Sequence, residues 1–218
     1  MSKPIIYWHP FSAPCRGTWL VAQNLDIDVD FRLLDLAAKE HLKPEFLKIN
    51  PMHCVPTLDD AGFVIWESRA ISTYLADLRE TEFYPKNRQF RAKIDSLLYF
   101  DATFLYQRAR DITRPIIYEG LKVISDEKVQ KIYEGYDHLE WFLTKNEFVA
   151  GDSLTIADLH LLATIETTKL LGMDFKKHPK IHLWYEKCSK CVTGFNEHVK
   201  FTQNYVDMIK SKLQSTKN

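Results

Sequence analysis

Residues 9–16, HPFSAPCR, join a short apolar stretch at residues 5–8 to an amphipathic stretch that begins near Pro14. The apolar stretch is typical of a buried strand, and a proline is typical of the first turn of a helix. Ser12 is therefore expected at the start of a helix, where unpaired amides and the helix dipole favour an anion. A serine there either caps the helix or donates a hydrogen bond to a thiolate that a ligand brings. Such a donor could lower the pKa of a thiol, ordinarily near ~8.5, by about two pH units.

Cys15 lies three residues after Ser12, so the pair occupies the positions of a C-x-x-C redox motif with serine in the first place. Reversible dithiol chemistry then lacks its nucleophile. Thiol–disulfide exchange through Cys15 alone stays an alternative. The sequence contains no G-x-S-x-G motif, which argues against a Ser-His-Asp hydrolase.

A second group of polar residues lies in residues 50–58, NPMHCVPTL, followed by residues 63–71, FVIWESRAI. Pro56 opens a short strand, where a cis bond would leave the Val55 backbone unpaired and able to pair with a peptide. Glu67, Ser68 and Arg69 open a helix, where Ser68 could hold a carboxylate and Glu67 an ammonium group. Together the two stretches predict an edge that binds a peptide.

The secondary structure expected around these residues changes along the chain from mixed strands and helices to helices alone. Strands are expected at residues 5–8, 29–34, 57–58 and 63–65, with helices at 14–25, 44–48 and 67–78. This βαβ-then-ββα order favours a small α/β domain of thioredoxin type. Helical periodicity then predicts helices at 90–110, 126–142, 155–170, 178–191 and 196–213. We expect a thioredoxin-like domain over residues 1–80, a polar linker over 81–89 and an all-helical domain over 90–218.

Thr155 to Asp158 form a capping box before one of these helices, with Leu154 and Leu159 as its hydrophobic staple. We interpret this motif as structural, since both polar side chains are occupied at the helix end.

Composition narrows the function further. The chain has 218 residues, 45% hydrophobic, and its 29 basic residues balance 29 acidic ones, so no net charge favours nucleic acid or an anionic membrane. It shows no long apolar run and no signal peptide, and four cysteines are too few for a disulfide framework, which favours a cytoplasmic location. Neither the C-x-x-C at residues 188–191 nor the eight histidines have metal-ligand spacing, so no metal is expected.

The stretch N-P-x-H-x-V-P-T-L, followed nine residues later by E-S-R-A-I, resembles the glutathione-site signature of cytosolic glutathione transferases, and the chain resembles their insect delta and epsilon classes. The S-x-P-C-R stretch, residues 41–46 and residues 98–101 fall in the same order, so the resemblance covers essentially the whole chain. It implies a thioredoxin-like domain that binds glutathione as co-substrate, an all-helical domain that completes a hydrophobic pocket, and a homodimer.

The resemblance also implies a role for individual residues. Ser12 falls at the serine that stabilises the thiolate, and His41 and His53 fall at contacts to the glycyl carboxylate. Val55, before the expected cis Pro56, would pair its backbone with the cysteinyl unit beside Cys54. Glu67, Ser68 and Arg69 fall where the γ-glutamyl end is held.

For the hydrophobic pocket the expected residues are Pro14, Leu36, Tyr106, Arg110, Arg114, Tyr118, Phe201 and Tyr205. The segment with Arg108, Arg110, Asp111 and Arg114 is more charged than the aromatic stretch typical of the delta class. It is alternatively a solvated helix face on which Arg110 and Arg114 pair with Asp111.

The implied activity is conjugation of the glutathione thiolate to electrophilic, hydrophobic small molecules, as in detoxification. A glutathione-dependent peroxidase or isomerase would use the same thiolate. A low-turnover carrier of hydrophobic or hormone-like ligands is a further alternative.

Overall fold

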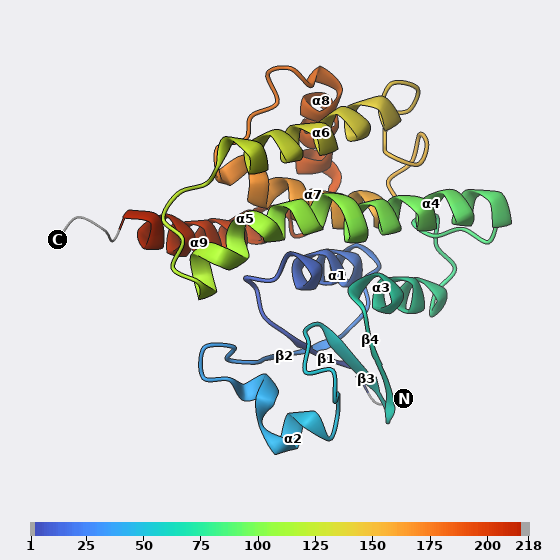
Figure 1. Cartoon of the computed structure of the whole chain (residues 1–218). Helices are drawn as coiled ribbons and strands as arrows, with labels where there is room; N and C mark the ends of the chain where they lie inside the picture. Colours follow the sequence, from blue (N-terminus) through green and yellow to red (C-terminus); the bar gives the residue numbers. More distant parts are fainter. Residues whose placement is uncertain (1–2, 215–218) are drawn as a thin grey trace.

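The computed structural model describes residues 3–214 (Figure 1). Its first part is built on one four-stranded sheet, formed by β1 (Ile5–Trp8), β2 (Asp30–Leu33), β3 (Thr57–Asp60) and β4 (Phe63–Trp66) in the order β2-β1-β3-β4. β1 pairs parallel with β2, whereas β3 pairs antiparallel with both β1 and β4. This topology confirms the expected βαβ and ββ units and the thioredoxin-like fold.

Helices cover both faces of the sheet (Figure 1). α1 (Ala13–Asn24) and α3 (Ser68–Asp77) lie on the face towards the second domain, and α2 (Pro44–Leu47), preceded by a 3₁₀ turn, η1 (Glu40–Leu42), lies on the other. β3 extends two residues further towards the connecting turn than expected, and β4 begins at Phe63 as expected and ends one residue later, at Trp66. Only Ala61 and Gly62 therefore connect the two strands, both with positive φ. Two residues of positive φ are what a tight hairpin turn requires.

The second part is all-helical, as expected. It contains α4 (Arg88–Phe100), the π-helical turn η2 (Asp101–Leu105), α5 (Tyr106–Tyr118), α6 (Asp126–Phe142), α7 (Ile156–Leu170), α8 (Pro179–Cys191) and α9 (Phe195–Gln214). α7 is buried along nearly its whole length and packs against α1 of the first domain. None of the helices within residues 3–214 is long and apolar enough to cross a membrane.

The first helix of this domain differs from the expected 90–110 at both ends. It begins at Arg88, because Asn87 caps it by accepting the Phe90 amide at 3.0 Å. With η2 it continues through α5 to Tyr118, past Pro115. Pro115 has no N–H for the carbonyl of Asp111 four residues earlier, and that carbonyl instead accepts a 2.7 Å hydrogen bond from Lys128 Nζ. A side chain from α6 therefore supplies the donor that proline lacks.

The capping box at the start of α7 is present as expected. The buried Asp158 carboxylate accepts hydrogen bonds from the Thr155 amide and hydroxyl, and also from the Val149 amide and the Trp184 indole, at 2.8–2.9 Å. Asp158 thus ties α8 and the preceding loop to the end of α7.

Candidate functional site

A cavity of about 740 Å³ lies between the sheet domain and helices α5, α7 and α9. This volume is within the range of small-molecule sites. The loop before α1 and the loop after β2 form one side of it, together with Val55. The lining residues are His9, Phe11, Ser12, Ala13, Leu36, Ala37, His41, Val55, Tyr106, Ala109, Arg110, Thr113, Arg114, Ile117, Tyr118, Thr164, Thr167, Tyr205, Met208 and Lys212.

Ser12 lines the cavity and is the N-cap of α1. Its hydroxyl oxygen accepts from the Cys15 amide at 3.4 Å, which leaves the hydroxyl proton to donate to a ligand. The capping interpretation and the thiolate interpretation are therefore compatible in this geometry.

Cys15 is fully buried one turn into α1, and burial raises its pKa to about 12 although the Ser12 hydroxyl and the His9 backbone favour the thiolate. At neutral pH the side chain is a protonated, inaccessible thiol. This environment does not favour thiol–disulfide exchange through Cys15.

The two histidines expected at one end of glutathione are neighbours. His41 lines the cavity, and its ring centroid is 6.4 Å from that of the exposed His53, which is not among the lining residues. Burial, and then the neighbouring His53, lowers the pKa of His41. His53 is placed by Asn50, whose carbonyl accepts its amide at 3.0 Å and whose buried side chain donates to Thr57 at 2.8 Å.

The bond between Val55 and Pro56 is cis, as expected. β3 begins only at Thr57, and within residues 3–214 no hydrogen bond joins the Val55 backbone to another residue. Val55 lines the cavity, so its amide and carbonyl are available to a ligand. Cys54 precedes Val55 in the chain, and its sulfur lies 3.5 Å from the side-chain nitrogen Nδ2 of Asn50. Burial raises the pKa of the Cys54 thiol.

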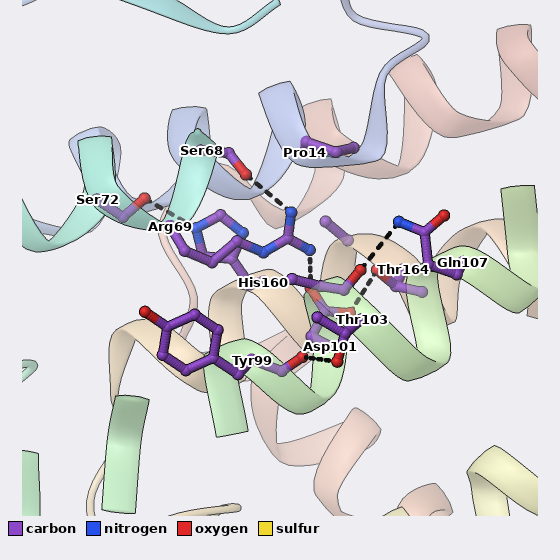
Figure 2. Close-up of polar contacts among 12 residues, drawn as sticks. Pro14, Ser68, Arg69, Ser72, Tyr99, Asp101, Thr103, Gln107, His160 and Thr164 are labelled. Carbon is purple, nitrogen blue, oxygen red and sulfur yellow. Dashed lines mark hydrogen bonds and ion pairs between the residues drawn. The ribbon is translucent and has the colours of Figure 1, made fainter. Parts of the chain in front are cut away.

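Glu67, Ser68 and Arg69 open α3 as expected, but none of them lines the cavity. Ser68 is buried and accepts from Arg69 Nη1 at 2.8 Å, and Arg69 Nη2 forms an ion pair with the buried Asp101 of η2 (Figure 2). The other oxygen of Asp101 accepts from Thr164 at 2.7 Å, and Thr164 does line the cavity. This chain of contacts joins α3 to the helical domain.

Sequence reasoning did not assign a role to Asp101 or Thr164. The available signal was an acidic residue inside the apolar stretch LLYFDATFL, which must find a partner if it is buried. Burial raises the pKa of Asp101, whereas Arg69 and Thr164 favour its ionised form.

Six of the eight residues expected in a hydrophobic pocket line the cavity: Leu36 on the side of the sheet domain, and Tyr106, Arg110, Arg114, Tyr118 and Tyr205 on the helical side. Burial raises the pKa of Tyr106 to about 12, so it is a neutral phenol. Pro14 and Phe201 are not among the lining residues. Ala13 takes the place next to Ser12, and the Phe201 ring packs against Trp8 and Trp19 at 5.6 and 5.4 Å.

Several lining residues were missed although helical spacing points to them. Ala109, Thr113 and Ile117 follow Tyr106 at three- and four-residue steps along α5, and Met208 and Lys212 follow Tyr205 along α9. Residues at such steps share one helix face, so one pocket residue per helix would have predicted the others.

The charged segment of α5 is not a face of internal ion pairs. In the described part of the chain, Asp111 forms no ion pair with Arg110 or Arg114. Arg108 instead lies 3.5 Å from Glu134 of α6 and 3.4 Å above the Phe104 ring. Arg108 therefore contacts the neighbouring helix, whereas Arg110 and Arg114 line the cavity.

No group of three or more His, Cys, Asp or Glu side chains among residues 3–214 is arranged to hold a metal ion. The polar groups of the cavity are hydroxyls, imidazoles, backbone amides and cationic side chains. Such groups suit a charged peptide that presents its own thiol.

Comparison with known proteins agrees with this geometry. Residues 3–77 match the glutathione S-transferase N-terminal domain and residues 89–190 match the C-terminal domain. A delta-class glutathione transferase of Nilaparvata lugens is 40% identical, with a TM-score of 0.92 over 96% of this chain and 99% of that chain.

Two further solved structures are similar at the same TM-score of 0.92. An epsilon-class glutathione S-transferase from the housefly, Musca domestica, is 34% identical over 96% of this chain and 98% of that chain. A glutathione transferase homologue from Drosophila mojavensis with bound glutathione is 32% identical over 97% and 98%. These matches favour a transferase over the peroxidase, isomerase and carrier alternatives, and glutathione is its co-substrate. Since the matches extend over both domains, the chain belongs to the glutathione S-transferase family.

Proposed function

We propose that this transferase activates the thiol of glutathione at Ser12 and adds the sulfur to electrophilic, hydrophobic small molecules, as in detoxification. The observation that carries the proposal is the Ser12 hydroxyl, which lies in the cavity at the N-terminus of α1 with its proton free to donate. The hydroxyl and the helix dipole stabilise the thiolate and hold it beside the second substrate. The sulfur then forms a bond to the electrophilic carbon, and the leaving group departs with the electron pair of the broken bond.

The remaining contacts of glutathione follow from the proposal. His41 and His53 bind the glycyl carboxylate, and the backbone of Val55 pairs with the cysteinyl unit next to Cys54 and the cis Pro56. Glu67, Ser68 and Arg69 hold the γ-glutamyl end. Support comes from the position of His41 and Val55 in the cavity wall and from the start of α3 at Ser68.

The proposal is tested with Ser12→Ala and a chromogenic aryl halide. A hydrogen bond to a charged group contributes ~1.5–3 kcal/mol, so kcat/KM should fall about 10- to 150-fold, and the pKa of the bound thiol should rise by one to two pH units. Thiolate absorbance in the binary complex measures that pKa directly.

Ser125→Ala is the matched control, because Ser125 caps α6 with the same 3.4 Å contact to an amide but is not among the residues that line the cavity. Ser125→Ala should lower the free energy of unfolding, as the loss of a helix cap does, and leave the pKa of the bound glutathione thiol unchanged. Equal rates and equal thiol pKa values in the native chain and Ser12→Ala would remove Ser12 from the mechanism.

We also propose a homodimer. β4 is an edge strand of the sheet, and its Phe63 and Trp66 are 51% and 39% exposed, while Tyr99 of α4 is 68% exposed. Large apolar side chains at an open sheet edge favour a protein partner. Sedimentation of the native chain should give the mass of two chains, and Phe63→Glu combined with Trp66→Lys should give one. A native chain that sediments as a monomer contradicts the proposal.

A cytoplasmic location is proposed as well. It is supported by Cys15, Cys54, Cys188 and Cys191, which are all unpaired thiols. Cell fractionation tests it.

A further inference from the structure

Two arginines of the helical domain contribute positive charge to the cavity wall. Arg110 and Arg114 of α5 both line the cavity, and both are exposed at its mouth. No Asp or Glu of residues 3–214 is among the lining residues. Among the described lining residues, a ligand in this part of the cavity therefore faces the cations Arg110 and Arg114 and no carboxylate.

These two arginines are not used in the ion pairs that hold the domain together. Arg110 donates to the Gln107 side-chain oxygen at 3.4 Å, a weak contact to a neutral group. Arg114 forms no ion pair in the described part of the chain, although it also borders a neighbouring groove that contains Asp111 and Glu119. By contrast, Arg108 on the same helix has the Glu134 carboxylate and the Phe104 ring as partners.

Their position on α5 separates them from the end of the cavity nearest to α3. Tyr106 lies below the guanidinium of Arg69, whose carbon is 5.6 Å from the ring centroid. Arg110 and Arg114 follow at four-residue steps, so they lie ~6 and ~12 Å further along the helix axis. Ile117, three residues after Arg114 on α5, and Met208 of α9 add apolar surface to the cavity wall. This end therefore combines an apolar surface with two cations at the mouth.

We propose that the site prefers acceptors that carry a carboxylate, or a similar anion, joined by an apolar spacer to the electrophilic carbon. Arg110 and Arg114 are the residues that select the anion. The inference rests on the proposed function and names the substrate class of that same site. The anion stays near the mouth in contact with water, and the apolar spacer enters the cavity and brings the reacting carbon towards Ser12.

The matched probes are a benzylidene acetone with a carboxylate at the para position of its ring, and the methyl ester of the same compound. In both, the glutathione sulfur bonds to the β-carbon of the enone, the electron pair of the double bond moves to the carbonyl oxygen, and water protonates the α-carbon. No leaving group or oxidant is needed. The probes differ in charge at the far end of the ring and share the reacting group.

We expect the native chain to have a lower KM for the carboxylate than for the ester. Exposed charge contacts are weak and screened by salt, so Arg110→Gln combined with Arg114→Gln should raise the carboxylate KM by about five- to tenfold. The KM of the ester and that of glutathione should change less than about twofold. Sodium chloride should reduce the preference of the native chain. Lys190→Gln combined with Lys200→Gln removes the same charge from exposed positions outside the cavity wall and should change none of these values.

Binding is measured separately by calorimetry with the saturated, unreactive carboxylate analogue in the presence of S-methylglutathione. If neither probe is conjugated but this analogue binds in an arginine-dependent way, the proposed conjugation fails and the anion preference stands. The inference is overturned if the double arginine variant affects both probes equally, if it raises only the KM of glutathione, or if the native chain does not distinguish the carboxylate from the ester in turnover or binding.

Discussion

Gly17→Ala should destabilise the fold even though alanine is the better helix former. Gly17 lies inside α1 against α7, and a Cβ at this position would lie 2.4 Å from Nδ1 and 2.8 Å from Cε1 of His160. Both distances are far shorter than a normal contact, so the imidazole or the two helices would have to move.

The imidazole of His160 has little freedom to move. It is 1% exposed, and its Nε2 is 2.8 Å from the Ser72 hydroxyl of α3 (Figure 2). Overpacking costs ~1–3 kcal/mol and loss of this hydrogen bond ~1 kcal/mol, while the helix preference of alanine returns ~1 kcal/mol. The free energy of unfolding should therefore fall by ~1–3 kcal/mol. Urea denaturation followed by circular dichroism, at one protein concentration, measures it.

The sign of the effect should reverse when the imidazole is removed. In a His160→Ala background the new methyl group has space, so Gly17→Ala should stabilise by up to ~1 kcal/mol through helix propensity alone. The coupling between the two positions is then ~2–4 kcal/mol, above the usual error of such cycles. An equal loss of stability in both backgrounds would refute the reasoning, because it would place the cost of the methyl group somewhere other than His160.

Three further changes have defined outcomes. Asp158→Ala leaves four buried or capping donors without an acceptor and should cost ~3–5 kcal/mol in urea denaturation, with the KM for glutathione unchanged. Burial holds the pKa values of His160 and His198 well below the ordinary 6.5, so below that pH only the unfolded chain takes up their two protons. As the pH is lowered below 6.5, these two histidines together should reduce the free energy of unfolding by ~2.7 kcal/mol per pH unit, and His198→Leu should remove half of that contribution. The lowered pKa of His41 should rise when a carboxylate binds, so S-methylglutathione should bind more tightly as pH falls through ~6.5, and His41→Asn should weaken this dependence in calorimetry.

Local patterns were sufficient for most elements of the fold. The apolar run before Ser12, the proline after it and the capping box at Thr155 each specify an element end through short-range sterics and hydrogen bonds. The end of α5 was misjudged because its continuation past Pro115 depends on Lys128, a donor from another helix. No local rule predicts that contact.

The residues of the candidate site also fall into those that local sequence features could place and those that depend on tertiary packing. Ser12 and Val55 could be placed from the chain alone, because a helix start and an X-Pro bond are local features. The partner of Arg69 could not, since Asp101 comes from the other domain. Phe201 was expected in the pocket, but its ring packs against Trp8 and Trp19 instead. Which face of α9 meets the cavity is decided by tertiary packing, and the structure shows that it is the face with Tyr205, Met208 and Lys212.

The helical domain does more than form a wall for the second substrate, because it also holds the loop that carries Ser12. Arg16 is fully buried and donates to the Pro10 carbonyl in that loop at 2.9 Å. Its other nitrogen donates to the Thr167 hydroxyl at 2.6 Å and to the Ala163 carbonyl of α7 at 3.3 Å. Burial lowers the pKa of Arg16 to about 10, so the side chain keeps its charge at neutral pH. A single guanidinium thus connects the helix that lines the acceptor side of the cavity to the backbone two residues before Ser12. The position of the sulfur and the shape of the acceptor site are therefore coupled through α7, and a substitution that loosens α1 from α7 should impair catalysis before it unfolds the chain.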